Sequence, residues 1–155
     1  MKQQIASAFG LRQPPAKVTD ITVNSTLRDD AHHFAGLDWT RVTANDWRDY
    51  SDAFTGFSPE AFVYFLPSLL VLSLDRSNGP LVAADSLVST LDTSGDPELW
   101  PDWLRERFGL LTTAELEAVR AWSTLYLADA EKGEGSEFAR VQNTVAMLAL
   151  NAEAQ

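Results

Sequence analysis

Three aspartates spaced three residues apart are the side chains of this chain best suited to do chemistry. Asp46, Asp49 and Asp52 would share one side of an α-helix as a loose acidic ridge. The ridge could work as an acid/base pair, as a weak divalent-cation site, or as a recognition stripe for a basic partner, and the solvent-facing side of an amphipathic helix is its simplest explanation. Among the functional uses we favour partner recognition, because acid/base catalysis needs carboxyls whose pKa values burial has separated, and no sequence feature indicates this.

The two histidines of the chain form a second candidate, directly after an acidic pair. Neighbouring helical residues point roughly 100° apart, so His32 and His33 cannot both face one metal ion. Asp29 and His33 have the i, i+4 spacing of a two-ligand clip, but no third or fourth ligand is evident. We therefore expect no metal site, keep Asp29 and His33 as weak candidates only, and expect a solvated helix start here.

The five tryptophans can serve either the core or an interface. We expect Trp39, Trp47 and Trp122 to lie in the core. Trp100 and Trp103 lie three residues apart with a proline between them, and they are the better interface candidates. Core and interface roles are about equally favoured for this pair.

One residue type and two sequence motifs that several kinds of catalysis require are absent. The chain has no cysteine, which excludes disulfides, thiolate metal sites and thiol nucleophiles. The sequence has neither a Gly-x-Ser-x-Gly nucleophile elbow nor a phosphate-binding loop. We predict no catalytic residues and no cofactor, and a protein that is not an enzyme.

The charge of the chain favours a protein partner. Residues 1–28 carry four basic residues and one acidic residue, a balance of +3, whereas the remainder carries 8 basic and 21 acidic residues, a balance of −13. This acidity disfavours nucleic acid and anionic membranes as partners, because phosphate contacts need a basic surface. An acidic body attracts basic proteins, although acidity for solubility alone is common.

The location that the sequence favours is the cytoplasm. The longest apolar run, residues 61–74, spans 14 residues interrupted by Pro67, which is too short to cross a bilayer. The first residues lack the features of a signal peptide. We expect a soluble, cytoplasmic protein.

The segment that should position all other elements begins at Ser58. Ser58 can cap a helix, Pro59 suits its first position, and Glu60 lies near the positive end of the helix dipole. Residues 61–74 are apolar on every side, so this helix belongs in the middle of a bundle, with a kink at Pro67. Around it we expect an all-α, single-domain bundle (residues 1–155) of five to seven helices with a central apolar helix at about residues 59–74.

The surrounding helices follow from caps, breakers and spacing. Trp47, Tyr50 and Phe54 fit one face of a single helix ended by Gly56. We expect further helices over residues 81–91 and 97–108, the latter beginning as two short turns because of an internal proline. A capping box at 112–115 starts another helix. A turn at 131–135 leads to the last helix, and residues 10–28 form a less regular N-terminal segment.

The run SPEAFVYFLP at residues 58–67 resembles the signature of a family of small, uncharacterised bacterial proteins, Leu-Ser-Pro-Glu-Ala-Phe-x-Tyr-Tyr-Leu-Pro-Ala-Phe-Leu. Phe57 replaces the leading leucine, Phe65 the second tyrosine, and Ser68-Leu69 the Ala-Phe pair. The flanks resemble the family as well, with a Phe-x-Gly-x-x-Trp element at residues 34–39 and a Phe-x-x-Leu-Thr helix opening at residues 108–112. The resemblance extends over most of residues 5–127.

The resemblance implies a small helical domain without an established activity. Similar proteins often sit beside secreted toxin genes, which implies an immunity role. The leading hypothesis is a non-enzymatic, acidic protein-binding module whose partner is a basic protein, such as a toxin that it neutralises. The candidate binding residues are Asp46, Asp49, Asp52, Trp100 and Trp103. The alternatives are a metal-dependent or hydrolytic enzyme that uses the Asp/His cluster, and a structural homodimer.

Overall fold

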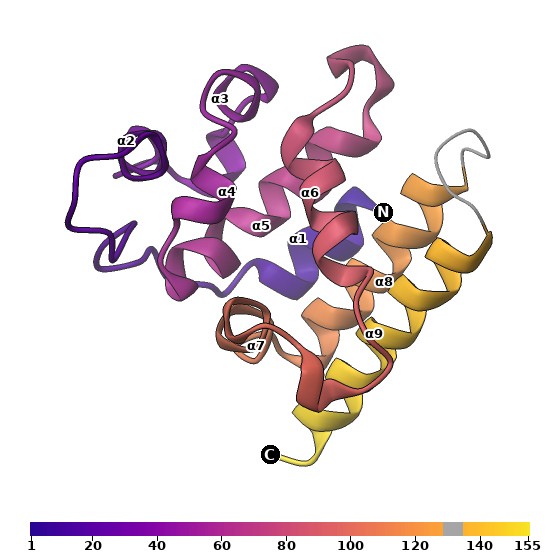
Figure 1. Ribbon diagram of the computed structural model, residues 1–155. Coiled ribbons are helices and arrows are strands. Elements are labelled where there is room, and N and C mark those ends of the chain that lie inside the picture. The colour runs from indigo at the N-terminus through magenta and orange to yellow at the C-terminus, as the bar shows by residue number, and fades with distance from the viewer. Residues whose placement is uncertain (129–134) are drawn as a thin grey trace.

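The computed structural model describes residues 1–128 and 135–155, and this part of the chain is an all-α single domain without a β-strand (Figure 1). Its α-helices are α1 (Lys2–Phe9), α2 (Thr26–His33), α3 (Ala44–Asp49), α4 (Ala53–Gly56), α5 (Pro59–Leu74), α6 (Val82–Leu91), α7 (Asp102–Phe108), α8 (Thr113–Leu127) and α9 (Gly135–Glu153). Three short 3-10 helices are η1 (Trp39–Arg41), η2 (Arg76–Asn78) and η3 (Pro97–Leu99). The all-α prediction is confirmed. The expected number of helices, five to seven, is wrong, because the described residues form nine α-helices.

Helix α5 is the centre of the fold, as its apolar surface predicts. All residues from Ala61 to Leu70 are buried, and α1, α3, α6, α7 and α8 all contact the helix (Figure 1). The hydroxyl of Ser58 accepts the backbone N–H of Ala61 at 3.2 Å, and Pro59 occupies the first turn. The helix continues through Pro67 to Leu74. None of the described helices combines the length and the apolarity needed to cross a bilayer.

The single helix expected over Trp47, Tyr50 and Phe54 is divided in two, and that prediction is wrong. Helix α3 ends at Asp49, because the backbone of Tyr50 leaves the helical region (φ −126°, ψ 45°). Helix α4 then begins at Ala53. Trp47 and Phe54 are both buried, but on two separate helices. The break turns α4 toward α2, which it contacts closely.

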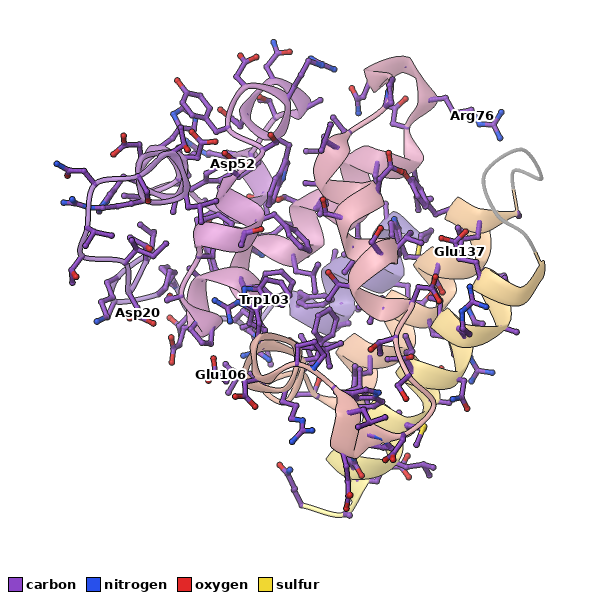
Figure 2. The ribbon with its side chains drawn as sticks, in the orientation of Figure 1. Asp20, Asp52, Arg76, Trp103, Glu106 and Glu137 are labelled. Atoms are coloured by element: carbon purple, nitrogen blue, oxygen red, sulfur yellow. The ribbon has the colours of Figure 1, made fainter. Side chains whose placement is uncertain are left out.

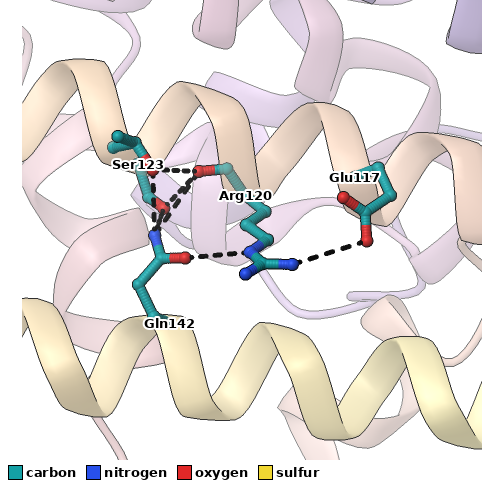
Figure 3. Close-up of polar contacts among 5 residues, drawn as sticks. Glu117, Arg120, Ser123 and Gln142 are labelled. Carbon is teal, nitrogen blue, oxygen red and sulfur yellow. Dashed lines mark hydrogen bonds and ion pairs between the residues drawn. The ribbon is translucent and has the colours of Figure 1, made fainter.

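The C-terminal part is built on a pair of long helices. α8 starts with the predicted capping box, in which Thr112 and Glu115 each accept the other's backbone N–H. α8 and α9 lie side by side (Figure 1), and Figure 3 shows the polar contacts that join them. There Gln142 of α9 accepts a hydrogen bond from Arg120 at 3.1 Å and donates one to the hydroxyl of Ser123 at 2.6 Å. The expected turn at 131–135 lies outside the described residues except for Gly135, where α9 begins.

The N-terminal segment is held against the junction of α4 and α5 by hydrogen bonds. Residues 10–25, between α1 and α2, contain turns and bends only. The carbonyl of Val18 accepts the N–H of Ser58 at 2.8 Å, and the hydroxyl of Thr19 donates to the carbonyl of Gly56 at 2.6 Å. These contacts satisfy backbone groups that helix ends leave unpaired. The stretch between residues 97 and 108 contains η3, then Pro101, then α7, as the proline predicts.

Candidate partner-binding surface

Five aspartates lie on α2, on α3 or directly before α4, and we call this group the acidic face. Its members are Asp29, Asp30, Asp46, Asp49 and Asp52. Asp29, Asp49 and Asp52 are exposed, and Asp30 and Asp46 are half-buried. Figure 2 labels Asp52 in this region, beside α3 and α4. The expected ridge is therefore spread over two elements, since Asp46 and Asp49 lie on α3 and Asp52 lies beyond its end.

The structure pairs His33 with Asp46, and not with Asp29. Nε2 of His33 lies 2.8 Å from Oδ1 of Asp46, and the imidazole ring stacks on Tyr50 with 3.6 Å between the ring centroids. The two groups of candidate residues that the sequence separates thus meet in one place. Among the described residues, no group of three or more His, Asp or Glu is arranged to hold a metal ion.

Asp46 is held as a carboxylate by the residues around it. Burial alone would raise its pKa, but hydrogen bonds from His33 and from the backbone and hydroxyl of Thr43 outweigh burial and lower the pKa of Asp46. The capping box of α3 joins the N–H of Thr43 to the carboxylate of Asp46 at 2.8 Å and the N–H of Asp46 to the hydroxyl of Thr43 at 3.3 Å. Asp46 therefore starts α3 and orients His33 at the same time.

Asp30 has the opposite electrostatic environment. Burial and the neighbouring charges of Asp52 and Asp29 raise the pKa of Asp30, although the backbone N–H of Asp52 donates a hydrogen bond to its carboxylate at 3.0 Å. Repulsion between like charges is the reason that the neighbours act in this direction. The ionised form of Asp30 is thus disfavoured, first by burial and then by the charges of Asp52 and Asp29.

The arginines on the same helices turn toward neutral groups. Arg28 donates to the side-chain oxygen of Asn24 at 2.7 Å, and Arg48 donates to the side-chain oxygen of Asn45 and to the carbonyl of Asn78. Within residues 1–128 and 135–155, no lysine or arginine forms an ion pair with the acidic face, and its contact with His33 is ionic only when the imidazole is protonated. Much of the negative charge of this surface is therefore not neutralised by ion pairs within the described residues.

The two tryptophans proposed for an interface differ in exposure. Trp100 is 5% exposed, and its indole donates to the carbonyl of Ser94 at 2.7 Å. Trp103 is half-buried and packs against Phe54 and Phe62. Of these two tryptophans, only Trp103 is appreciably accessible to solvent. It lies next to α4, away from α2.

The three tryptophans expected in the core also differ. Trp47 and Trp122 are buried, and their indoles donate to Ser68 and Ser73, each at 2.9 Å. Trp39 is only partly buried, which corrects the expectation for this residue. It belongs to η1, a short element on the surface of α5.

No family model, curated protein or solved structure matches this chain. The acidic face and the surfaces next to it are therefore the features from which a function can be inferred.

Asp30 and Tyr50 belong to this surface, but the sequence pattern does not mark them as candidate binding residues. Tyr50 follows Asp46 by four residues, and that spacing could have placed the two together. Asp30 comes close to Asp52 only because α2 packs on α4, and no local sequence pattern predicts this packing.

Opposite pH responses of two variants test these electrostatics. At neutral pH, Asp46→Asn should lower the free energy of unfolding by about 1 kcal/mol, because it removes a charged cap. The folded pKa of Asp46 is lowered, so the advantage of wild type over Asp46→Asn should hold above the unfolded value of about 3.9 and disappear as the pH falls below it. Denaturant unfolding of both proteins between pH 2 and 7 measures this difference.

Asp30→Asn supplies the matched comparison. The folded pKa of Asp30 is raised, so ionisation of Asp30 weakens the fold, and wild type should lose stability relative to Asp30→Asn as the pH rises through that pKa. At neutral pH we expect Asp30→Asn to be as stable as wild type or more stable, by up to about 1 kcal/mol. The same pH response in both variants would contradict the opposite environments of Asp30 and Asp46.

Proposed function

We propose that this chain is a non-enzymatic, acidic, helical module that binds a basic protein through its acidic face in the cytoplasm. The resemblance of residues 58–67 to a family often encoded beside secreted toxins makes neutralisation of a toxin by an immunity protein the specific form of this proposal. The crowding of Asp30 and Asp52, in which the backbone N–H of Asp52 lies 3.0 Å from the carboxylate of Asp30, is the observation that carries it.

Such crowding weakens the isolated fold but suits a basic partner. Uncompensated carboxylates steer a positively charged protein toward the surface and favour the correct orientation on contact. When the cations of the partner enter, they offset the charges of Asp52 and Asp29 beside Asp30, which favours binding. The same charges oppose self-association through this face, which argues against a homodimer formed there.

The acidic face is also fixed in shape. Gly56 of α4 lies so close to α2 that a Cβ atom at this position would stand 2.1 Å from the carbonyl oxygen of Leu27. The N–H of Asp52 adds a hydrogen bond to Asp30 across the same contact. A surface that is ordered before binding loses less conformational entropy when the complex forms.

Charge removal at the acidic face is the direct test. The proteins encoded next to the gene of this chain should be purified and titrated against wild type by calorimetry. The triple variant Asp29→Asn/Asp49→Asn/Asp52→Asn should bind the basic one at least about tenfold more weakly, with a smaller dependence on salt. These three aspartates are exposed, so the variant should keep its fold.

A control with the same change in net charge shows whether position matters. Asp102→Asn/Glu117→Gln/Glu153→Gln removes three exposed carboxylates from α7, α8 and α9. It should bind the partner within about twofold of wild type, because distant exposed charges are screened at physiological salt. Equal losses in the two triple variants, or no binding by any neighbouring gene product, would contradict the proposal.

The enzymatic alternative uses the pair His33 and Asp46, since such a pair can act as a general base. Among the described residues, however, no serine or threonine hydroxyl hydrogen-bonds to the imidazole of His33, and the hydroxyl of Thr43 bonds to Asp46 instead. A thermal shift of the protein on addition of Mg²⁺, Mn²⁺ or Zn²⁺, lost in Asp46→Asn, would favour this alternative over the binding module.

A further inference from the structure

A pocket lies between η3, α7 and the C-terminal end of α9, and we call it the α7–α9 pocket. Its volume is about 320 Å³, which is at the lower end of the range for pockets that hold small molecules. Figure 1 shows this end of α9 below α7. The pocket is therefore large enough for a small organic ligand and too small for a helix.

The floor of the α7–α9 pocket is apolar. Four of the residues that line it belong to the buried core, and these are Trp100, Phe108, Leu111 and Leu148. The indole N–H of Trp100 donates to the carbonyl of Ser94 at 2.7 Å, so this side chain offers a ligand only its apolar surface. Ala152 of α9 adds a small, half-buried side chain to the lining. The floor thus suits the apolar body of a ligand.

The rim of the pocket carries one cation, Arg105. Nη2 of its guanidinium donates to the carbonyls of Pro97 and Glu98, both at 2.7 Å, which ties the side chain to η3. Nε and Nη1 of Arg105 make no hydrogen bond within residues 1–128 and 135–155. In the same part of the chain Arg105 forms no ion pair, although Glu98 also lines the pocket. The guanidinium is therefore positioned but not neutralised.

We propose that the α7–α9 pocket binds a small monocarboxylate, with the apolar body of the ligand on the floor and its carboxylate at the unused N–H groups of Arg105. A guanidinium donates charge-assisted hydrogen bonds to a carboxylate, and these are stronger than bonds between neutral groups. The backbone carbonyls that hold Arg105 reduce the conformational entropy that its side chain loses on binding.

The charges around the pocket favour a ligand with a single negative charge. Arg105 is the only cation that lines the pocket, and Glu98 brings one carboxylate to the same lining. The whole chain carries a net charge of −10, so a doubly charged phosphate suits the pocket less well than a carboxylate does. The pocket lies on other helices than the acidic face, so this proposal goes beyond the proposed function and does not rest on it.

A nuclear magnetic resonance titration with phenylacetate tests the pocket. Phenylacetate should shift the backbone amide signals of Arg105, Phe108 and Ala152 in a saturable way at millimolar concentration. Phenylacetamide has the same body without the charge, and acetate has the charge without the body. Each should bind at least about tenfold more weakly than phenylacetate. Absent shifts at these residues, or equal affinities for the three compounds, would overturn the proposal.

Two variants test the two parts of the site separately. Arg105→Gln should lower the affinity for phenylacetate about tenfold, whereas the control Arg41→Gln, which removes an exposed arginine outside the pocket, should leave it unchanged. Arg105 also holds η3, so Ala152→Phe supplies a variant that keeps this contact, fills the pocket and should abolish binding. Circular dichroism shows whether each variant is folded. Binding that survives either substitution in a folded protein would overturn the proposal.

Discussion

Replacing Glu115 with alanine should lower the free energy of unfolding by about 3 kcal/mol, because the substitution breaks a largely buried ion pair. Glu115 is 2% exposed and accepts both the Nε and an Nη group of Arg12, at 2.7 and 2.6 Å. It also accepts the N–H of Thr112 at 2.8 Å and so completes the capping box of α8. Without Glu115, Arg12 lacks its anion and the first turn of α8 loses its cap. Denaturant unfolding at pH 7 measures the effect.

A neighbouring glutamate on the same helix is the control. Glu117 is exposed and makes only a surface ion pair with Arg120 at 3.9 Å. Glu117→Ala should change stability by less than about 0.5 kcal/mol. In the background Arg12→Ala, the effect of Glu115→Ala should shrink to about 1 kcal/mol, the value of the cap alone. An effect of Glu115→Ala as small as that of Glu117→Ala would show that apolar contacts alone join α1 to α8.

Glu115 also shows which parts of the fold can be read from the sequence. The capping box spans four residues, so its pattern is visible in the chain, and the same holds for the cap of α5 at Ser58. Arg12 lies 103 residues before Glu115, and no local pattern connects the two. Helices and their starts are local properties, whereas the ion pair is a consequence of how α1 packs on α8.

In the acidic face, too, local features could be predicted from the sequence, whereas contacts between helices could not. The placement of Asp46 and Asp49 on one short helix is local and could be predicted. The break at Tyr50 could not, because spacing alone allowed the helix to continue to Phe54. The meeting of Asp30 with Asp52 depends on the contact between α2 and α4. The difference in exposure between Trp100 and Trp103 likewise depends on which helices cover them.

Replacing Gly56 with alanine should lower the free energy of unfolding by about 3 kcal/mol, since an added methyl group would overlap a neighbouring backbone. The Cβ atom would lie 2.1 Å from the carbonyl oxygen and 2.7 Å from the carbonyl carbon of Leu27. These are backbone atoms of α2, so no side-chain rotation relieves the overlap, and α2 must move away from α4. The movement would lengthen the hydrogen bond between Asp52 and Asp30. Binding of the basic partner should weaken together with stability.

A second glycine gives the matched control for this substitution. At Gly95 the nearest atom to an added Cβ is Nδ2 of Asn143 at 3.8 Å, an ordinary contact with a side chain. Gly95→Ala should therefore change stability by less than about 0.5 kcal/mol and leave partner binding unchanged. If Gly56→Ala is as well tolerated as Gly95→Ala, α2 and α4 do not touch as described. If Gly56→Ala loses stability but keeps full affinity for the partner at a temperature where it is folded, the partner does not depend on the arrangement of α2 and α4. The acidic face would then not be its binding site.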